Sequence, residues 1–257
     1  DDDGKEDVKE DDLNLLRVQL SRLIAYAESA DPGLQRQVAE KLANEAVKSE
    51  RQTQIVELGG LRLLLPLTQS KDPEVQRLAA HALANLSVNS ENQMTMAEKG
   101  GIEMLVGILK SPQGNLQRQA CKALANLSVN SCNKERVAAS GGILPLIELA
   151  GSSNVSVGVE AVAALANLAV NDENEVTIAE NAGLVPILAG ARSKNEDLQS
   201  QCARALRNLS VHPMNKARIK KMGGADILQG LLDSSSERTR QQARRALANL
   251  GNGNTGK

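Results

Sequence analysis

An asparagine recurs along the chain at a fixed step, at the end of a motif resembling ALANL. The interval is always 41 residues, and the six positions are Asn44, Asn85, Asn126, Asn167, Asn208 and Asn249. An amide side chain is both donor and acceptor, so a row of amides can bind the backbone of an extended peptide whatever its side chains. The same asparagines can instead bond to the backbone of a neighbouring repeat and hold a stack together. The spacing leaves both roles open.

Basic residues accompany these asparagines. On a helix, residues four, seven and eight positions earlier lie near the same face as the asparagine. The cations there are Arg36, Arg77, Arg118, Lys122, Arg204 and Arg245, and the acids are only Glu40 and Glu160. Such a surface favours acidic or phosphorylated peptide segments, unless it is ordinary solvated surface. The predicted peptide-binding residues are Asn44, Arg77, His81, Asn85, Arg118, Lys122, Asn126, Ala163, Asn167, Arg204, Asn208, Arg245 and Asn249.

One stretch departs from the basic pattern. Gly158, Val159 and Ala163 stand where the neighbouring repeats have glutamine, arginine or lysine. We expect a small apolar depression there that takes one bulky side chain of a partner. The alternative is a loosely packed repeat of weak helix propensity.

The elements that position these residues repeat with the same step. A Gly-Gly pair, replaced once by Ala182-Gly183, recurs every 41 residues and marks a turn in which a left-handed residue is favourable. In the unit around it, the sequence predicts helices over 92–99, 102–109 and 115–129. Sustained period-two alternation is absent, so the predicted fold class is all-α.

The third helix of each unit carries an apolar stripe. In one unit the stripe consists of Leu116, Ala120, Ala123, Leu124 and Leu127. A single three-helix unit cannot cover this stripe, so units stack into a solenoid with a continuous core. We expect five full repeats over 49–250 and a cap with a partial repeat over 13–48. Residues 1–12 and 251–257 are predicted to be a disordered acidic leader and a disordered tail.

Composition excludes several classes of protein. The net charge is −1; residues 1–12 carry −6, which leaves +5 for the remainder, too little for a general nucleic-acid binder. Tyr26 is the only aromatic residue, which excludes base-stacking platforms. No apolar run has the roughly 18–20 residues of a membrane span, and no secretory signal is present.

Catalytic and metal chemistry are not expected. Three cysteines and two histidines are too few and too scattered for a structural zinc site or a disulfide framework. Neither an adjacent base nor an oxyanion donor can be identified for Cys121, Cys132 or Cys202. The sequence therefore predicts a protein that is not an enzyme and that uses no cofactor or metal.

The three-helix unit, its Gly-Gly turn and the ALANLS ending of its third helix resemble the armadillo repeat. The resemblance implies a right-handed solenoid and a concave groove in which the asparagine ladder bonds the backbone of an extended peptide. Nuclear-import armadillo proteins have a tryptophan four residues before this asparagine. Here the residues at that position are His81, Lys122, Ala163, Arg204 and Arg245, so a basic nuclear-localisation peptide is disfavoured.

Within that family the chain is similar to the armadillo repeats-only group of apicomplexan parasites, through its acidic leader running into LNLLRVQLSRL and through VAEKLANEAV. That resemblance implies an acylated N-terminus on the cytosolic face of rhoptries, with a myosin and adaptor proteins as partners. Because the chain opens at Asp1 without methionine, we expect any lipid anchor to lie upstream of Asp1. That anchor would be the only membrane contact of the protein, which we expect to be a monomer. The alternatives are the armadillo tail of a cytoskeletal motor and a vacuolar-type tether.

Overall fold

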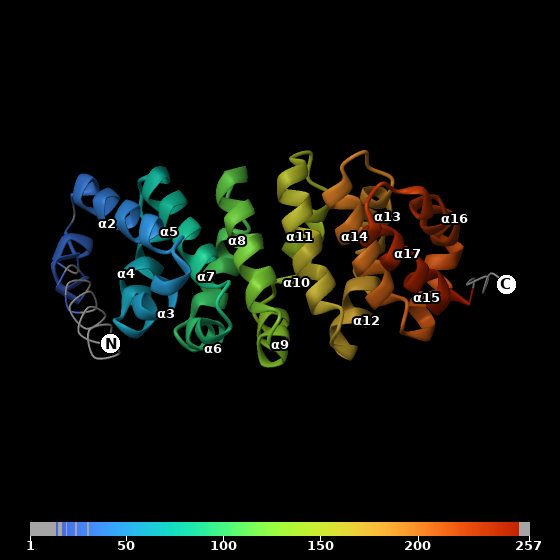
Figure 1. Ribbon diagram of the computed structural model, residues 1–257, viewed down its shortest axis with the longest axis horizontal. Coiled ribbons are helices and arrows are strands. Elements are labelled where there is room, and N and C mark those ends of the chain that lie inside the picture. Colours follow the sequence, from blue (N-terminus) through green and yellow to red (C-terminus); the bar gives the residue numbers. More distant parts are fainter. Residues whose placement is uncertain (1–13, 15–16, 19, 24, 30, 252–257) are drawn as a thin grey trace, which may run out of the picture. The chain divides into compact units, whose positions relative to one another are not determined.

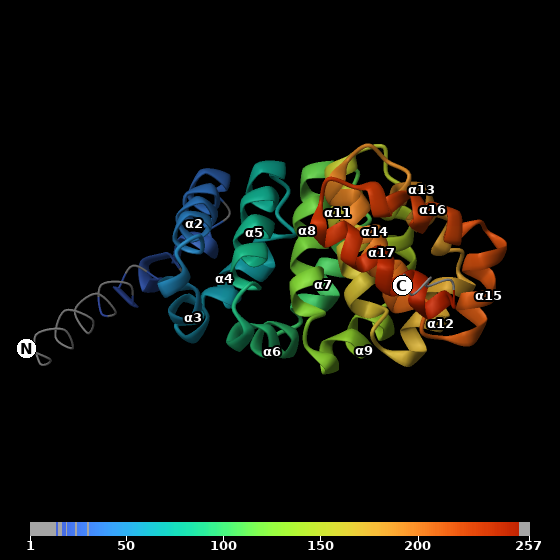
Figure 2. The same cartoon turned by 45° about the vertical axis from the view of Figure 1, so that its right-hand side comes forward.

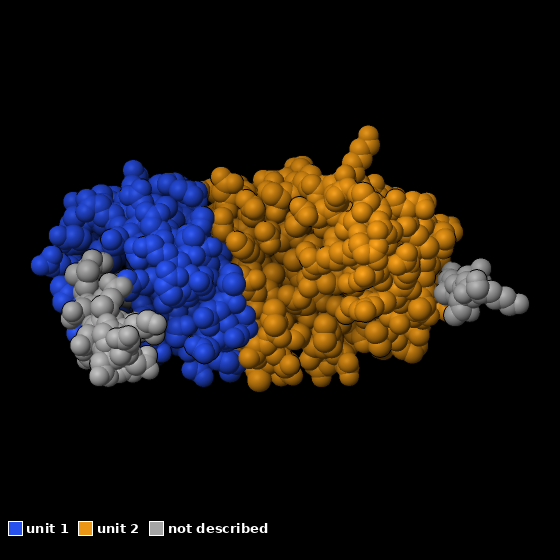
Figure 3. Space-filling model, viewed as in Figure 1, with its two compact units in different colours: residues 1–104 blue, residues 105–257 orange. Residues whose placement is uncertain are grey.

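The computed structural model describes residues 14, 17–18, 20–23, 25–29 and 31–251, and every regular element within them is helical. This confirms the predicted all-α fold class. The predicted leader, 1–12, and the predicted tail beyond Gly251 lie outside the described residues. The chain forms two compact units, Asp1–Met104 and Leu105–Lys257, which are described separately below (Figure 3).

Residues 14, 17–18, 20–23 and 25–27 of the N-terminal unit are helical, and after them come one long helix, a three-helix repeat and the start of the next. These later helices are α2 (Pro32–Glu45), α3 (Ser49–Glu57), α4 (Gly60–Leu67), α5 (Pro73–Leu86) and α6 (Ser90–Glu98). The boundary between the units falls inside α7 (Gly101–Ile108). The long helices α2 and α5 pack side by side (Figure 2).

The C-terminal unit contains the remaining repeats. Its helices are α8 (Gly114–Leu127), α9 (Ser131–Ala139), α10 (Ile143–Ala150), α11 (Val155–Leu168), α12 (Asp172–Glu180), α13 (Leu184–Ala191), α14 (Glu196–Leu209), α15 (Pro213–Lys221), α16 (Gly224–Gly230), the short 3-10 helix η1 (Leu231–Asp233) and α17 (Glu237–Leu250). The third helices α8, α11, α14 and α17 pack on one another in that order (Figure 1). The three-helix repeat predicted from the 41-residue step is confirmed.

The third helix α8 ends at Leu127, two residues earlier than predicted. The chain tightens there: the Ser128 N–H still donates to the Leu124 carbonyl at 2.9 Å, but the Val129 N–H donates to Asn126, only three residues back. Asn130 then caps the next helix, since its side-chain oxygen accepts the Cys132 N–H at 3.0 Å. Asn130 therefore sets the boundary between α8 and α9.

The two positions of each glycine turn favour glycine for different physical reasons. The first adopts a left-handed backbone, with φ of 83° at Gly100 and 75° at Gly141. Ala182 fills this position with φ of 61°, so alanine tolerates it there. The second glycine lies against the end of the first helix: a Cβ on Gly183 would meet the Ile178 carbonyl oxygen at 2.6 Å. Close approach of the two helices therefore requires glycine at the second position.

The core is built from leucine, isoleucine, valine and alanine. Leu124, Leu165 and Leu206 are fully buried on successive third helices. Ala123 and Ala164, one position earlier, are also fully buried and let those helices approach closely. Small side chains at the contacts thus compensate for the missing phenylalanine and tryptophan, because density depends on complementary shape rather than on large residues.

Candidate functional site

The predicted binding residues of the C-terminal unit lie on its four adjacent third helices. We define the third-helix face as Arg118, Lys122 and Asn126 on α8; Val159, Ala163 and Asn167 on α11; Ser200, Arg204 and Asn208 on α14; and Gln241, Arg245 and Asn249 on α17. Arg118, Gln241 and Arg245 are exposed, and the four asparagines are half-buried. The helical packing therefore brings these side chains onto neighbouring elements, with their amides partly open to solvent.

The asparagine amides bond to the preceding third helix. The Asn167 amide nitrogen donates to the Ala125 carbonyl at 2.6 Å, and that of Asn208 donates to Ala166 at 2.7 Å. Asn249 repeats the contact with the Arg207 carbonyl at 3.0 Å. These bonds provide the stacking role that the sequence left open. The Asn249 amide nitrogen also donates to the Ser210 hydroxyl at 3.2 Å. Within the described chain the side-chain oxygens of Asn167 and Asn249 accept no hydrogen bond.

The corresponding residues of the N-terminal unit are arranged differently. Arg77 makes two hydrogen bonds with Glu74, at 2.6 and 2.8 Å, and Arg36 pairs with Asp72 at 2.6 Å. Asn44 is exposed on α2, and His81 and Asn85 are half-buried on α5. The amide nitrogen of Asn85 is buried without a hydrogen-bond partner. The two arginines that made this region appear basic in the sequence are therefore neutralised by carboxylates.

On the C-terminal unit, Arg118 and Lys122 of α8 lie near Glu160 of α11, the next third helix. Burial raises the pKa of the Glu160 carboxyl, and the nearby charges of Lys122 and Arg118 oppose that rise. Neither cation forms an ion pair with a described residue. This part of the face thus retains more positive than negative charge.

Three arginines on α14 and α17 form what we name the arginine cluster: Arg204, Arg207 and Arg238. Burial, together with the charges of Arg238 and Arg207, lowers the pKa of Arg204. Arg207 donates to the side-chain oxygens of Asn208 at 3.0 Å and Gln242 at 3.1 Å, and Arg238 is exposed. In the part of the chain that the structure describes, none of the three forms an ion pair. Positive charge therefore gathers here without a carboxylate to neutralise it.

Sequence reasoning missed Arg207 and Arg238. Arg207 had a visible signal, because its repeat has ALRNL where the others have ALANL or, in the first, KLANE. Arg238 had none: it lies eleven positions before Asn249, and only the positions four, seven and eight residues before each asparagine were compared. Only the packing of α17 on α14 brings Arg238 near Arg204.

The region expected to be an open apolar depression is partly covered. Ala163 is only 8% exposed, and one terminal nitrogen of Arg204 donates to its carbonyl oxygen at 3.1 Å. The Nε of Arg204 is buried and has no hydrogen-bond partner. The short side chain of Ala163 lets Arg204 reach the backbone of α11. This corrects the sequence-based expectation: a guanidinium, rather than empty apolar surface, lies beside Ala163.

A second row of asparagines links the first helices. Asn92, Asn133, Asn174 and Asn215 recur with the same 41-residue step. The Asn174 amide donates to the Lys134 carbonyl at 3.2 Å, and the Asn215 amide donates to Glu175 at 3.0 Å. These residues are at most 3% exposed. This row therefore stabilises the stack, and its spacing would have revealed it.

The described residues contain no group of three or more histidine, cysteine, aspartate or glutamate side chains able to hold a metal ion. Cys121 and Cys202 are buried, and burial raises the pKa of each thiol to about 12, so both stay protonated at neutral pH. His212 caps α15, its Nδ1 accepting the Met214 N–H at 3.3 Å. These residues therefore serve packing and helix capping.

Comparisons with known proteins agree with this architecture. The family model described as Armadillo/beta-catenin-like repeat matches residues 49–88 and 89–129. An engineered protein with a crystal structure has 32% sequence identity to this chain. The match covers 91% of this chain and 97% of that one, with a TM-score of 0.85. A designed armadillo repeat protein is 25% identical, with coverage of 89% and 98% and a TM-score of 0.84.

A further designed armadillo repeat protein, in complex with the peptide (KR)4, is 24% identical, with coverage of 89% of this chain and 98% of that one and a TM-score of 0.82. The comparison with curated proteins finds no match. Stacked three-helix units with a row of partly open amides define a helical repeat scaffold. The chain belongs to the armadillo repeat family.

Proposed function

We propose that the chain is a non-enzymatic adaptor whose third-helix face, within residues 105–257, binds extended peptide segments carrying carboxylate or phosphate groups. The armadillo fold is typically a scaffold without catalytic activity. Asn126, Asn167, Asn208 and Asn249 would bond the peptide backbone, and Arg118, Lys122, Arg245 and the arginine cluster its acidic groups. Asn44, Arg77, His81 and Asn85 would form the corresponding surface of the N-terminal unit.

The arginine cluster is the observation that carries this proposal. Guanidinium groups form paired hydrogen bonds with phosphate and carboxylate oxygens, and such charge-assisted bonds are the strong ones. Arg207 and Arg238 lie close enough to Arg204 for their charges to lower its pKa, and none of the three has a carboxylate partner in the described chain. An anionic ligand would relieve their mutual repulsion. The cationic peptide (KR)4 belongs to a designed protein of 24% identity and would increase that repulsion here.

The test compares three short peptides of equal length by fluorescence anisotropy: alternating glutamate and serine, the same peptide with phosphoserine, and alternating lysine and arginine. We expect the phosphoserine peptide to bind most tightly and the lysine–arginine peptide least. Arg238→Ala should weaken phosphoserine-peptide binding roughly tenfold to hundredfold, since a hydrogen bond to a charged group contributes about 1.5–3 kcal/mol.

Arg192→Ala is the matched control, because Arg192 is exposed, follows the last residue of α13 and is not one of the residues of the third-helix face or the arginine cluster. It should leave the affinity unchanged. Tighter binding of the lysine–arginine peptide, or equal affinity of Arg238→Ala and the unaltered protein, would contradict the proposed function.

We also propose, from the resemblance of the N-terminal sequence, that the natural protein is a monomeric adaptor tethering a myosin and other adaptor proteins to the cytosolic face of rhoptries. Among the described helices, none combines the length and apolar character needed to cross a bilayer. Tagging the complete natural protein in an apicomplexan parasite tests this role. Rhoptry labelling with a co-purifying myosin supports it; labelling of microtubules or a vacuole would favour the motor-tail or vacuolar alternative.

A further inference from the structure

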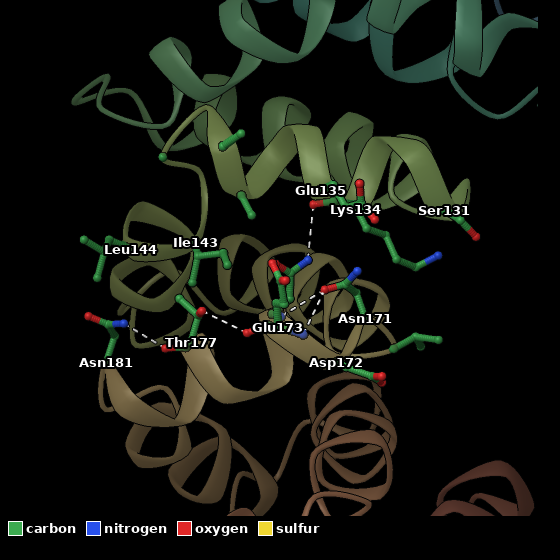
Figure 4. A pocket seen from close by; sticks show the side chains of 15 residues that line it. Ser131, Lys134, Glu135, Ile143, Leu144, Asn171, Asp172, Glu173, Thr177 and Asn181 are labelled. Carbon is green, nitrogen blue, oxygen red and sulfur yellow. Dashed lines mark hydrogen bonds between the residues drawn. The ribbon is translucent and has the colours of Figure 1, made fainter.

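A cleft of about 1000 Å³ lies between the first helices α9 and α12. Figure 4 shows Lys134 and Glu135 from α9 on one wall, and Glu173 and Thr177 from α12 on the other. The cleft shares no residue with the third-helix face, so the inference below does not depend on the proposed function.

Two differences from the other repeats add apolar surface to this cleft. Ala139, in the last turn of α9, stands where the other first helices have Glu57, Glu98, Glu180 and Lys221. Leu144, at the start of α10, stands where other repeats have Arg62, Glu103, Val185 and Asp226. The short side chain at 139 leaves the cleft open. Leu144 is 55% exposed at its edge, although burying such a side chain is favourable.

The rim of the cleft is acidic. Glu135, Asp172 and Glu173 line it, and none of the three forms an ion pair with another described residue. Lys134 forms no ion pair with them, since its ammonium donates to the Val129 carbonyl at 3.0 Å, and one cation thus stands against three acids. Burial also lowers the pKa of Lys134. The cleft thus combines apolar surface with an excess of negative charge.

The walls favour a helical ligand over an extended one. An extended segment needs hydrogen-bond partners for its backbone, and the polar side chains of α12 that line the cleft are already engaged. Asn171 accepts the Asn174 N–H, and the Asn174 amide donates to the Lys134 carbonyl. Thr177 and Asn181 each donate to a backbone carbonyl four residues earlier. A helix satisfies its own backbone and can place one side-chain ridge into the groove between two others. The two nine-residue helices are each about 13 Å long, which accommodates two to three turns of a partner.

We propose that this cleft binds a cationic amphipathic helix of a partner protein, with apolar residues against Ala139 and Leu144 and a lysine or arginine at the rim of Glu135, Asp172 and Glu173. The acids fix the sign of the partner's charge. They also disfavour the other occupant of an apolar surface, an anionic lipid bilayer, by like-charge repulsion.

The test uses the whole chain and two designed helical peptides with leucine at helical spacing. One carries lysine, and its counterpart carries glutamate at the same positions. We expect only the lysine peptide to shift the backbone amide resonances of Ala139, Leu144 and Thr177. Ala139→Lys restores a long side chain and adds like charge, and should weaken binding at least tenfold. Glu98→Lys, the matching position one repeat earlier, should not.

The Glu135→Gln/Glu173→Gln variant removes two rim charges without filling the cleft, and it too should weaken binding of the lysine peptide. This double variant also tests the proposal if the Ala139→Lys variant fails to fold. Equal binding of both peptides would overturn the proposal, as would lysine-peptide binding unaffected by Ala139→Lys or by the double variant. Resonance shifts confined to residues outside the cleft, or no shift at all, would overturn it as well.

Discussion

The same side chain has two distinct roles in this molecule. Asn174 and Asn215 lie sealed between first helices, at 3% and 1% exposure, and serve only the stack. Asn167 and Asn249 also bond to the preceding helix but remain half-buried, with side-chain oxygens that accept nothing in the described chain. Only the second pair can bind a ligand without breaking the stack, because an amide has more than one hydrogen-bonding group.

This difference predicts separable effects on stability and binding. Asn174→Ala leaves the buried Lys134 carbonyl without its donor, which should cost about 1–3 kcal/mol of unfolding free energy. Asn167→Ala should cost about 1 kcal/mol or less, because water reaches the half-buried site. Urea unfolding measures both. Phosphoserine-peptide affinity should fall only for Asn167→Ala; equal destabilisation, with affinity lost only in Asn174→Ala, would contradict the assignment.

The sequence could not distinguish paired from unpaired cations. Arg36 and Arg77 met the same helical criterion as Arg204, but Asp72 and Glu74 neutralise them. Asp72 lies 36 residues from Arg36, at the start of the next third helix, so the periodicity of one helix gave no sign of the contact. The burial of Arg204 against Ala163 was equally hidden, because it depends on packing between α11 and α14.

The helices and turns themselves were largely predictable. The 41-residue step, the Gly-Gly pair and the apolar stripe gave each helix of the unit to within about two residues. The physical need for the second glycine was not visible, because it arises from the Ile178 carbonyl and its equivalents lying where a Cβ would stand. Local signals therefore fix element type and order, while close contacts between elements explain individual residues.

The fourth position of the first helix shows how one element supports another. Gln52 and Gln93 each donate to a carbonyl at the end of the preceding third helix, at 3.1 Å to Ala46 and 3.2 Å to Ser87. Glu175 occupies this position in the fourth repeat and, when ionised, cannot donate. Its Oε2 is buried without a partner. Burial raises its pKa, the charge of Asp172 adds to that rise, and the charge and backbone N–H of His212 oppose it.

Glu175→Gln should therefore stabilise the protein at pH 7 by about 1–2 kcal/mol, because the amide can donate to the Ala169 carbonyl and no buried charge remains. The folded pKa of Glu175 lies above its unfolded value. Its contribution to stability is accordingly retained at pH below that unfolded value and lost as pH rises through the folded pKa.

The gain over the unaltered protein should thus shrink toward pH 4, as measured by urea unfolding across this range. Glu173→Gln, an exposed neighbour on α12, is the control and should change stability little. A destabilised Glu175→Gln variant at pH 7, or a gain that grows as pH falls, would contradict this explanation.

The two compact units differ in their free charge. In Asp1–Met104, the arginines of the long helices are tied to acids, whereas Leu105–Lys257 holds the arginine cluster and Asn167 and Asn249 with unoccupied amide groups. We therefore infer that peptide recognition is concentrated in the second unit. The overall charge of −1 conceals this asymmetry.

Nuclear magnetic resonance of the asparagine side-chain amides tests this claim most directly. On saturation with the phosphoserine peptide, the amide resonances of Asn167, Asn208 and Asn249 should shift, while those of the sealed Asn174 and Asn215 should not. Unmoved resonances of all three at saturation, or shifts confined to residues 1–104, would contradict the account.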